Sequence, residues 1–183
     1  MKWSWPEEAS WKGEEGEIKW QNKRYIITMM NILPGIKKEL MDVSGEVART
    51  VVFKAAYNDS KEAVENVLSS NLAKLANKLG LLDRKVSEKL AEIIAQQGFG
   101  KAHVKEVDLP EEGRVIVENS FESQYYLDND IETEKPVCDM LRGLIAGASH
   151  ALTEQEMHAE EVKCRALGDD KCEFLISSER DLV

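Results

Sequence analysis

Three cysteines and one glutamate in the last third of the chain are of the types that hold a metal ion. Cys138 falls in the first turn of a predicted helix, and Glu161 falls on the strand that follows. Cys164 and Cys172 lie symmetrically about Gly168, so a hairpin that turns there sets their Cβ atoms about 4.5–5.5 Å apart. Two thiolates bound at roughly 2.3 Å to one tetrahedral zinc ion need about that separation. The four side chains together therefore predict one structural zinc site.

The oxygen ligand depends on the geometry of the strand. Residues 161 and 164 of a regular strand face opposite sides, because side chains alternate with a period of two. A β-bulge would bring Glu161 and Cys164 to one side; without a bulge, Glu160 is the alternative ligand. Three cysteines cannot all pair within one chain, so three buried, unpaired thiols are the other interpretation of the same residues.

Helices must position the first of these residues. Apolar residues recur at helical spacing over 36–51, 64–79 and 86–94. The polar segment 58–60 separates the first helix from the second and can cap the second one. Gly80 suits the C-terminal end of the second helix.

The second half of the chain alternates differently. Residues 103–109 and 114–121 are β-prone and flank a turn, and a further helix begins near Pro136. Two more strands, 156–166 and 172–177, end the chain. This order predicts an α+β fold in which an antiparallel sheet packs against several helices.

The N-terminal segment has no helical period. Residues 18–20 and 25–28 are β-prone and flank three polar residues, which is the pattern of a short hairpin. We therefore divide the chain into an extension with a hairpin, residues 1–29, and a domain, residues 30–183.

Composition narrows the classes of function. The formal net charge is -10 and the pI is about 4.9, so the surface repels nucleic-acid phosphates and anionic lipid heads. No apolar run approaches the roughly 20 residues that cross a bilayer, and the N-terminus lacks the pattern of a signal peptide. We expect a cytoplasmic protein that neither binds nucleic acid nor inserts into membranes.

The order of motifs from Cys138 to Phe174 is the most specific pattern in the sequence. A helix begins with Cys and contains Gly, and Glu-x-x-Cys, a Gly-Asp turn and Cys-x-Phe follow. The chain reads Cys138-Asp-Met-Leu-Arg-Gly143, Glu161-Val-Lys-Cys164, Gly168-Asp169 and Cys172-Glu-Phe174. This order resembles the vinyl-4-reductase domain family, and the resemblance extends over about residues 30 to 178.

The resemblance implies both a fold and a site. Domains of this family are similar in fold to the small subunits of the vesicle-tethering TRAPP complexes. In the sensor domains of aromatic-responsive transcription activators, a Cys-Glu-Cys-Cys zinc site lies beside an apolar ligand pocket. The matching positions are Cys138, Glu161, Cys164 and Cys172, so the resemblance favours Glu161 over Glu160.

Six aromatic residues are candidates for lining such a pocket, although aromatics at these spacings also suit an ordinary core: Phe53, Tyr57, Phe99, Phe121, Tyr125 and Tyr126. The resemblance implies a small hydrophobic or aromatic ligand. The alternative is an enzyme or enzyme subunit of tetrapyrrole vinyl reduction, and the absence of a nicotinamide, flavin or iron–sulfur motif counts against it.

Remaining polar residues have ordinary interpretations. The histidines, His103, His150 and His158, are expected to be exposed or half-buried polar residues, without a partner for a catalytic triad. Asp139 could support a metal ligand, but a carboxylate at a helix start is the simpler role.

Apolar residues on the first helix exceed what one buried stripe needs, including Val47, Val51, Val52 and Phe53. Together with the resemblance, this surplus predicts a homodimer. The sequence contains no helix-turn-helix or ATPase segment, so we expect a signal to pass through the dimer or a protein partner.

Overall fold

The computed structural model describes residues 10–12, 17–20, 23–25, 28–69, 83–109 and 111–178. The chain divides into two compact units, Met1–Ile32 and Leu33–Val183. In the first unit, β1 (Ser10–Lys12), β2 (Glu17–Trp20) and β3 (Lys23–Tyr25) form an antiparallel sheet in that order. The hairpin expected here is present, with a shorter turn than predicted.

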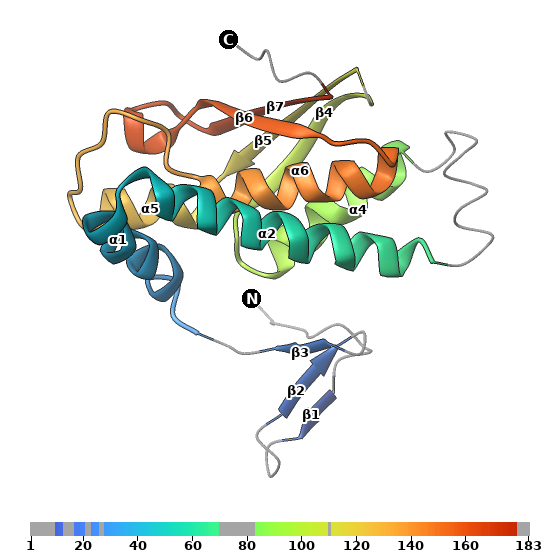
Figure 1. The fold of residues 1–183 in the computed structure, drawn as a ribbon, viewed down its shortest axis with the longest axis horizontal. Coiled ribbons are helices and arrows are strands. Elements are labelled where there is room, and N and C mark those ends of the chain that lie inside the picture. The colour runs from blue at the N-terminus through green and yellow to red at the C-terminus, as the bar shows by residue number, and fades with distance from the viewer. Residues whose placement is uncertain are drawn as a thin grey trace. The chain divides into compact units, whose positions relative to one another are not determined.

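The second unit combines helices with one sheet (Figure 1). Its helices within the described residues are α1 (Ile32–Ser44), α2 (Glu46–Val67), α4 (Asp83–Gln96), α5 (Phe121–Asp128), α6 (Asp139–Thr153) and the 3-10 turn η2 (Arg165–Leu167). Its strands are β4 (Lys101–Asp108), β5 (Glu112–Glu118), β6 (His158–Lys163) and β7 (Cys172–Ser177). They pair antiparallel in the order β4-β5-β7-β6. The predicted α+β class is confirmed.

The core lies between the sheet and α6. Val117, Leu141 and Phe174 are each fully buried there, on β5, α6 and β7. α6 packs on β6 and β7 and also makes extensive contact with α2, so it lies between the sheet and α2 (Figure 1). Among the described residues, no helix combines the length and the apolar character needed to span a membrane.

The helix break predicted at residues 58–60 is wrong. α2 continues through this segment, and the chain breaks instead at Gly45, whose φ of 59° is a conformation that suits glycine. Ser60 does not end the helix, because its hydroxyl donates to the Leu144 carbonyl on α6 at 2.7 Å. The part of the predicted second helix from residue 70 to 82 lies outside the described residues.

The apolar stripe predicted on the first helix lies on the outside. Its members are all at least 42% exposed: Ile36, Leu40, Val43, Val47 and Val51. α2 instead buries small residues, Ala48 and Ala56. The surplus apolar surface that suggested a dimer is therefore exposed to solvent in the single chain.

Glycines allow α2 and α6 to lie close together, as the sequence predicted. A Cβ atom added to Gly143 would overlap the backbone carbonyl of Phe53, and one added to Gly147 would overlap that of Tyr57. The two helix backbones are therefore in direct contact, which leaves no room for larger residues at these positions.

Helix α5 was missed by the sequence analysis, which extended a strand to residue 121. Asn119 has a φ of 53° and turns the chain out of β5. The Ser120 hydroxyl then accepts from the Ser123 backbone N–H at 3.4 Å and caps the new helix. Phe121, Tyr125 and Tyr126 therefore lie on a helix.

Candidate metal centre

The four predicted metal-binding side chains converge. One potential ligand atom from each of Cys138, Glu161, Cys164 and Cys172 lies within 4.8 Å of all the others, and all four residues are buried. Cys138 is the residue that precedes α6 rather than part of its first turn, and Cys164 directly follows β6. Cys172 begins β7. Three separate elements thus supply the group, which could hold a metal ion.

A β-bulge in β6 decides which glutamate takes part. Glu161 pairs with Phe174, whereas Lys163 pairs with Glu173, so the register shifts by one residue between them. The shift leaves Val162 on the outside, 42% exposed, while Glu161 is 4% exposed. The structure thus contains the bulge that the sequence left open, and it brings Glu161 into the group.

The Glu161 carboxylate lacks a partner for one oxygen. Its Oε2 accepts a hydrogen bond from the Cys138 backbone N–H at 2.8 Å. Its Oε1 is buried and has no hydrogen-bond partner among the described residues. Burial, followed by the negative charge of Cys164, raises the pKa of Glu161 to about 8. A cation beside Oε1 would satisfy this oxygen and favour the ionised carboxylate, so the group fits a metal ion.

The sulfur atoms are spaced for a shared metal rather than for a disulfide. Cys138 Sγ and Cys172 Sγ are 3.6 Å apart, and all three cysteines are free. A disulfide bond is about 2.05 Å long, whereas two thiolates on a tetrahedral zinc ion are separated by roughly 3.8 Å, from Zn–S bonds of about 2.3 Å. The observed separation is close to the second value.

One thiol is already prepared to ionise. Hydrogen bonds from Cys138 and then from Cys164 lower the pKa of Cys172 to about 4, whereas burial raises the pKa of the Cys138 thiol. The Arg165 backbone N–H also points at Cys172 Sγ, at 3.5 Å. A buried thiolate beside a buried carboxylate favours a bound cation, since metal binding displaces the remaining protons.

A buried ion-pair network surrounds the start of α6, and sequence reasoning missed it. Lys37 on α1 is 1% exposed, and its ammonium group contacts Glu122 Oε1 at 3.0 Å and Asp139 Oδ2 at 3.2 Å. The Glu122 carboxylate also accepts from the backbone N–H groups of Met140 and Leu141. Because Lys37 and Glu122 are 85 residues apart, no local pattern could have paired them.

Asp139 joins this network rather than serving only as a helix-start carboxylate. Arg49 of α2 binds it through Nε at 3.0 Å and through Nη2 at 3.0 Å. Arg142 adds a contact from the next turn at 3.2 Å. The residue after Cys138 is therefore held by α1, α2 and α6 together.

The predicted pocket aromatics form pairs around the core. Ring centroids are 5.2 Å apart for Phe99 and Phe121, 5.9 Å for Phe53 and Tyr57, and 6.0 Å for Tyr125 and Tyr126. Phe121 and Tyr126 are core residues, and the other four pack against the core at its edge. The six are thus neighbours of one core, contributed by α2, α5 and the turn before β4.

The histidines lie away from the metal group. His150 Nδ1 forms a hydrogen bond with the Tyr57 hydroxyl, and His103 Nε2 lies 3.3 Å from Glu118. His158 begins β6 and is half-buried. None of them belongs to the described metal-binding group.

Comparisons with known proteins support the fold and the motif. The family model of the vinyl-4-reductase domain matches residues 115–178, a range that contains all four metal-site candidates. The resemblance predicted from the motif is confirmed over these residues. The uncharacterized protein MJ0745 of Methanocaldococcus jannaschii is 40% identical over 47 residues, which are 26% of this chain and 26% of that protein.

Two solved structures share the fold. The phenol-responsive sensory domain of the transcription activator PoxR, crystallised with phenol, has a TM-score of 0.73 at 22% identity, covering 92% of this chain and 84% of that one. A trafficking protein particle complex subunit 3 from Naegleria fowleri, covalently bound to palmitic acid, has a TM-score of 0.55 at 16% identity, covering 81% of this chain and 93% of that one. The predicted likeness to TRAPP subunits is confirmed at the level of the fold.

Proposed function

Because residues 115–178 of this chain are a vinyl-4-reductase domain, we propose that the protein is a small-ligand sensory or scaffold module held together by one structural zinc ion. The observation that carries the zinc proposal is the buried Oε1 of Glu161, which has no hydrogen-bond partner in the described part of the chain and belongs to a group with three thiols. Sulfur-rich, four-coordinate sites favour zinc over harder cations.

The zinc ion has a structural role in this proposal. Cys138, Glu161, Cys164 and Cys172 fill a tetrahedral coordination shell, so no position stays open for water or substrate. The ion joins the start of α6 to the end of β6 and the start of β7. It supplies cross-linking between elements that are distant in sequence, and it makes one wall of the domain rigid.

The ligand is a small apolar or aromatic molecule. Support comes from the aromatic side chains at the edge of the core, namely Phe53, Tyr57, Phe99, Phe121 and Tyr125. Further support is the shared fold with one domain crystallised with phenol and another bound to palmitic acid. We propose that these side chains line the ligand site, and that a cytoplasmic homodimer or a protein partner transmits the signal.

Thermal unfolding in the presence of candidate ligands tests the sensory role. A ligand that binds only the folded state raises Tm by mass action, so we expect a phenol or a fatty acid to raise it in a concentration-dependent way. A Phe99→Ala variant should lose that response, while Phe53→Ala reports on the α2 side of the core. If no phenol, fatty acid or tetrapyrrole changes Tm, the protein is better described as a zinc-stabilised scaffold.

The enzymatic alternative has its own readout. Incubation with a divinyl tetrapyrrole and a chemical reductant should leave the vinyl groups unchanged, because the sequence shows no motif for a hydride or electron carrier. Reduction of a vinyl group that depends on the folded protein would replace the sensory proposal with an enzymatic one.

A further inference from the structure

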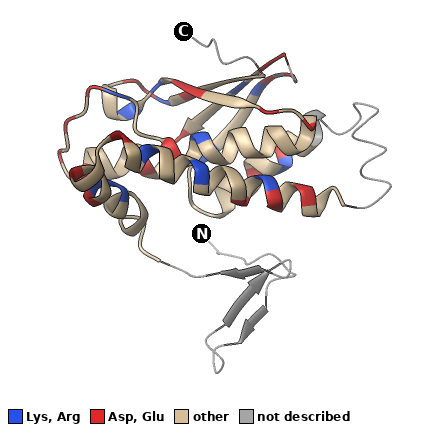
Figure 2. Cartoon of the chain, viewed as in Figure 1, with Lys and Arg blue, Asp and Glu red and all other residues tan. Residues whose placement is uncertain are grey.

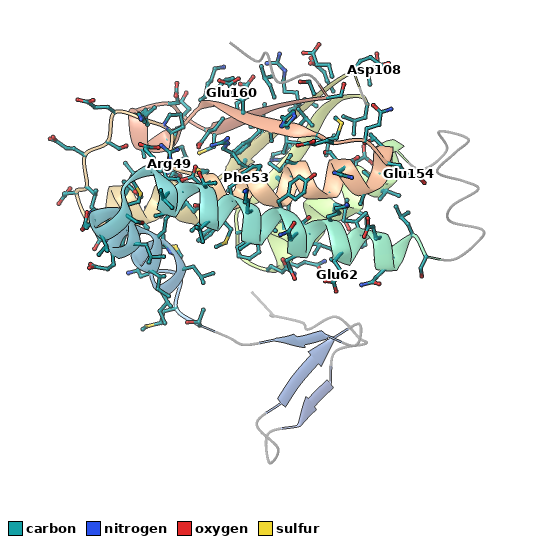
Figure 3. All side chains as sticks on the ribbon, in the orientation of Figure 1. Arg49, Phe53, Glu62, Asp108, Glu154 and Glu160 are labelled. Carbon is teal, nitrogen blue, oxygen red and sulfur yellow. The ribbon has the colours of Figure 1, made fainter. Side chains whose placement is uncertain are left out.

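A groove between α2 and α6 lies on residues that the zinc and ligand proposals scarcely use. Its volume is about 320 Å³, within the roughly 300–1,000 Å³ of small-molecule sites. Its lining consists of Glu46, Arg49, Thr50, Phe53, Asp139 and Arg142. Figure 3 labels Arg49 and Phe53 on the stretch of α2 that faces α6. One aromatic ring and two guanidinium groups therefore share a single hollow.

The two arginines keep donors that are not committed elsewhere in the described structure. Arg49 spends Nε and Nη2 on Asp139 and on the Pro136 carbonyl, and its Nη1 reaches Glu46 only at 3.8 Å. Arg142 spends Nε on the Ala159 carbonyl and Nη1 on Asp139. Each guanidinium carries five N–H donors, so Arg49 Nη1 and Arg142 Nη2 retain donors for a further acceptor.

Charges around the groove leave a local positive excess. The cations Lys37, Arg49 and Arg142 surround two buried carboxylates, Asp139 and Glu122. Glu46 at the rim is 65% exposed and is already paired with Lys135 at 2.9 Å, so it does not balance the third cation. Both signs of charge gather where α2 meets the start of α6 (Figure 2).

Glu46 also indicates which anion the groove accepts. Its carboxylate is the group nearest to the free Nη1 of Arg49, but the distance of 3.8 Å and its exposure make it a weak partner. A free carboxylate could sit deeper and take bidentate hydrogen bonds from guanidinium groups. The Phe53 ring, with the Arg142 guanidinium 5.4 Å from its centroid, offers a flat apolar surface beside them.

We propose that this groove binds a small carboxylate with a flat apolar body, the class to which arenecarboxylates belong. The carboxylate takes hydrogen bonds from Arg142 Nη2 and Arg49 Nη1, and the ring rests against Phe53. The net charge of -10 on the chain opposes the approach of anions, so selectivity rests on direct contacts in the groove. This site is independent of the proposed zinc ion and of the apolar ligand.

Titration calorimetry with sodium benzoate tests the proposal, with benzamide as the neutral analogue. We expect benzoate to bind at least about tenfold more tightly than benzamide, because the charge-assisted hydrogen bonds are lost in the amide. Arg142→Gln should weaken benzoate binding by about tenfold or more. Glu46→Gln should strengthen it several-fold, because it removes the competing carboxylate. Glu62→Gln is the matched control, about 20 Å further along α2, and should leave binding unchanged.

Thr50→Trp keeps the test decisive if Arg142→Gln unfolds. Thr50 lies on the exposed side of α2 and lines the groove, so the larger ring fills the hollow without touching the ion pairs of Asp139. We expect this variant to keep its fold and zinc content and to lose benzoate binding. Unchanged benzoate binding by Thr50→Trp, or equal binding of benzoate and benzamide by the wild-type protein, would overturn the proposal.

Discussion

Glu161 is the residue on which the metal site depends most clearly. It is buried, it has one satisfied and one unsatisfied oxygen, and burial raises its pKa to about 8. An unpaired buried carboxylate is costly, so its presence beside three thiols is explained best by a cation.

The neighbouring glutamate provides a matched comparison. We expect Glu161→Gln to lower the zinc content and the Tm, because an amide is a poorer zinc ligand than a carboxylate. Glu160→Gln should change neither, since Glu160 lies outside the metal-binding group. Elemental analysis and thermal unfolding of both variants check this, and an equal loss of zinc in the two would contradict the assignment.

The thiols should contribute more than the carboxylate. Cys164→Ser or Cys172→Ser is expected to destabilise the domain by several kcal/mol, because the free energy of zinc binding is also folding free energy. Denaturant unfolding with parallel zinc analysis measures this. A variant with wild-type stability and zinc content would remove that cysteine from the site.

Sequence alone predicted the thiols but left the glutamate open. Cys164 and Cys172 are symmetric about one glycine, so any hairpin there brings them together. The choice between Glu160 and Glu161 depends on a bulge at Val162, and a bulge is set by packing on both faces of the strand rather than by a local pattern.

At the scale of elements, Lys37 joins α1 to α5 and α6. Removing one partner of a buried ion pair leaves the other charge uncompensated. We expect Lys37→Met to lower the free energy of unfolding by about 3–5 kcal/mol near neutral pH. Lys38→Met is the matched control, because Lys38 pairs with Asp42 at the surface, and it should cost less than about 1 kcal/mol.

The Lys37 defect should also depend on pH. Burial raises the pKa of Glu122, and the charge of Lys37 opposes that rise. A carboxyl group whose pKa is higher in the folded state loses stability as pH rises through that pKa. Without Lys37 the pKa rises further, so the deficit of Lys37→Met should shrink when the pH falls from about 7 to about 5. A deficit that grows on acidification would contradict the pairing.

The contact between α2 and α6 gives a second test at this scale. We expect Gly147→Ala to destabilise the domain strongly, because the new methyl group would overlap the Tyr57 carbonyl. Gly35→Ala should be neutral or stabilising by about 0.5–1 kcal/mol, because its Cβ would meet the Tyr125 hydroxyl at an ordinary 3.5 Å. Denaturant titration of both variants separates these outcomes, and equal effects would contradict the close approach.

Helix boundaries show where sequence reasoning was limited. Polar residues 58–60 looked like a break, but Ser60 finds a partner on α6, a contact that only the folded chain reveals. The actual break at Gly45 lies inside a continuous apolar stripe, which concealed it. Helix α5 was hidden because its aromatic residues have high strand propensity, and tertiary packing outweighed that preference.

For the whole molecule, the exposed stripe on α1 and α2 remains the basis for a homodimer. Val43 is 87% exposed and Val47 is 63% exposed, and patches of this kind mark association surfaces. Light scattering at tens of micromolar should give twice the chain mass of 20.7 kDa. Val47→Glu should dissociate the dimer, whereas Val67→Glu, at the far end of α2, should not. A wild-type mass near 20.7 kDa would refute the prediction.

Native mass spectrometry of protein purified without chelator tests the central claim most directly, because it weighs the folded chain together with any bound metal. The account predicts one zinc ion per chain, retained until acid or chelator removes it and lost together with the folded charge distribution. A folded chain that carries well under half an equivalent of zinc, and whose Tm is unchanged by chelator, would contradict the account.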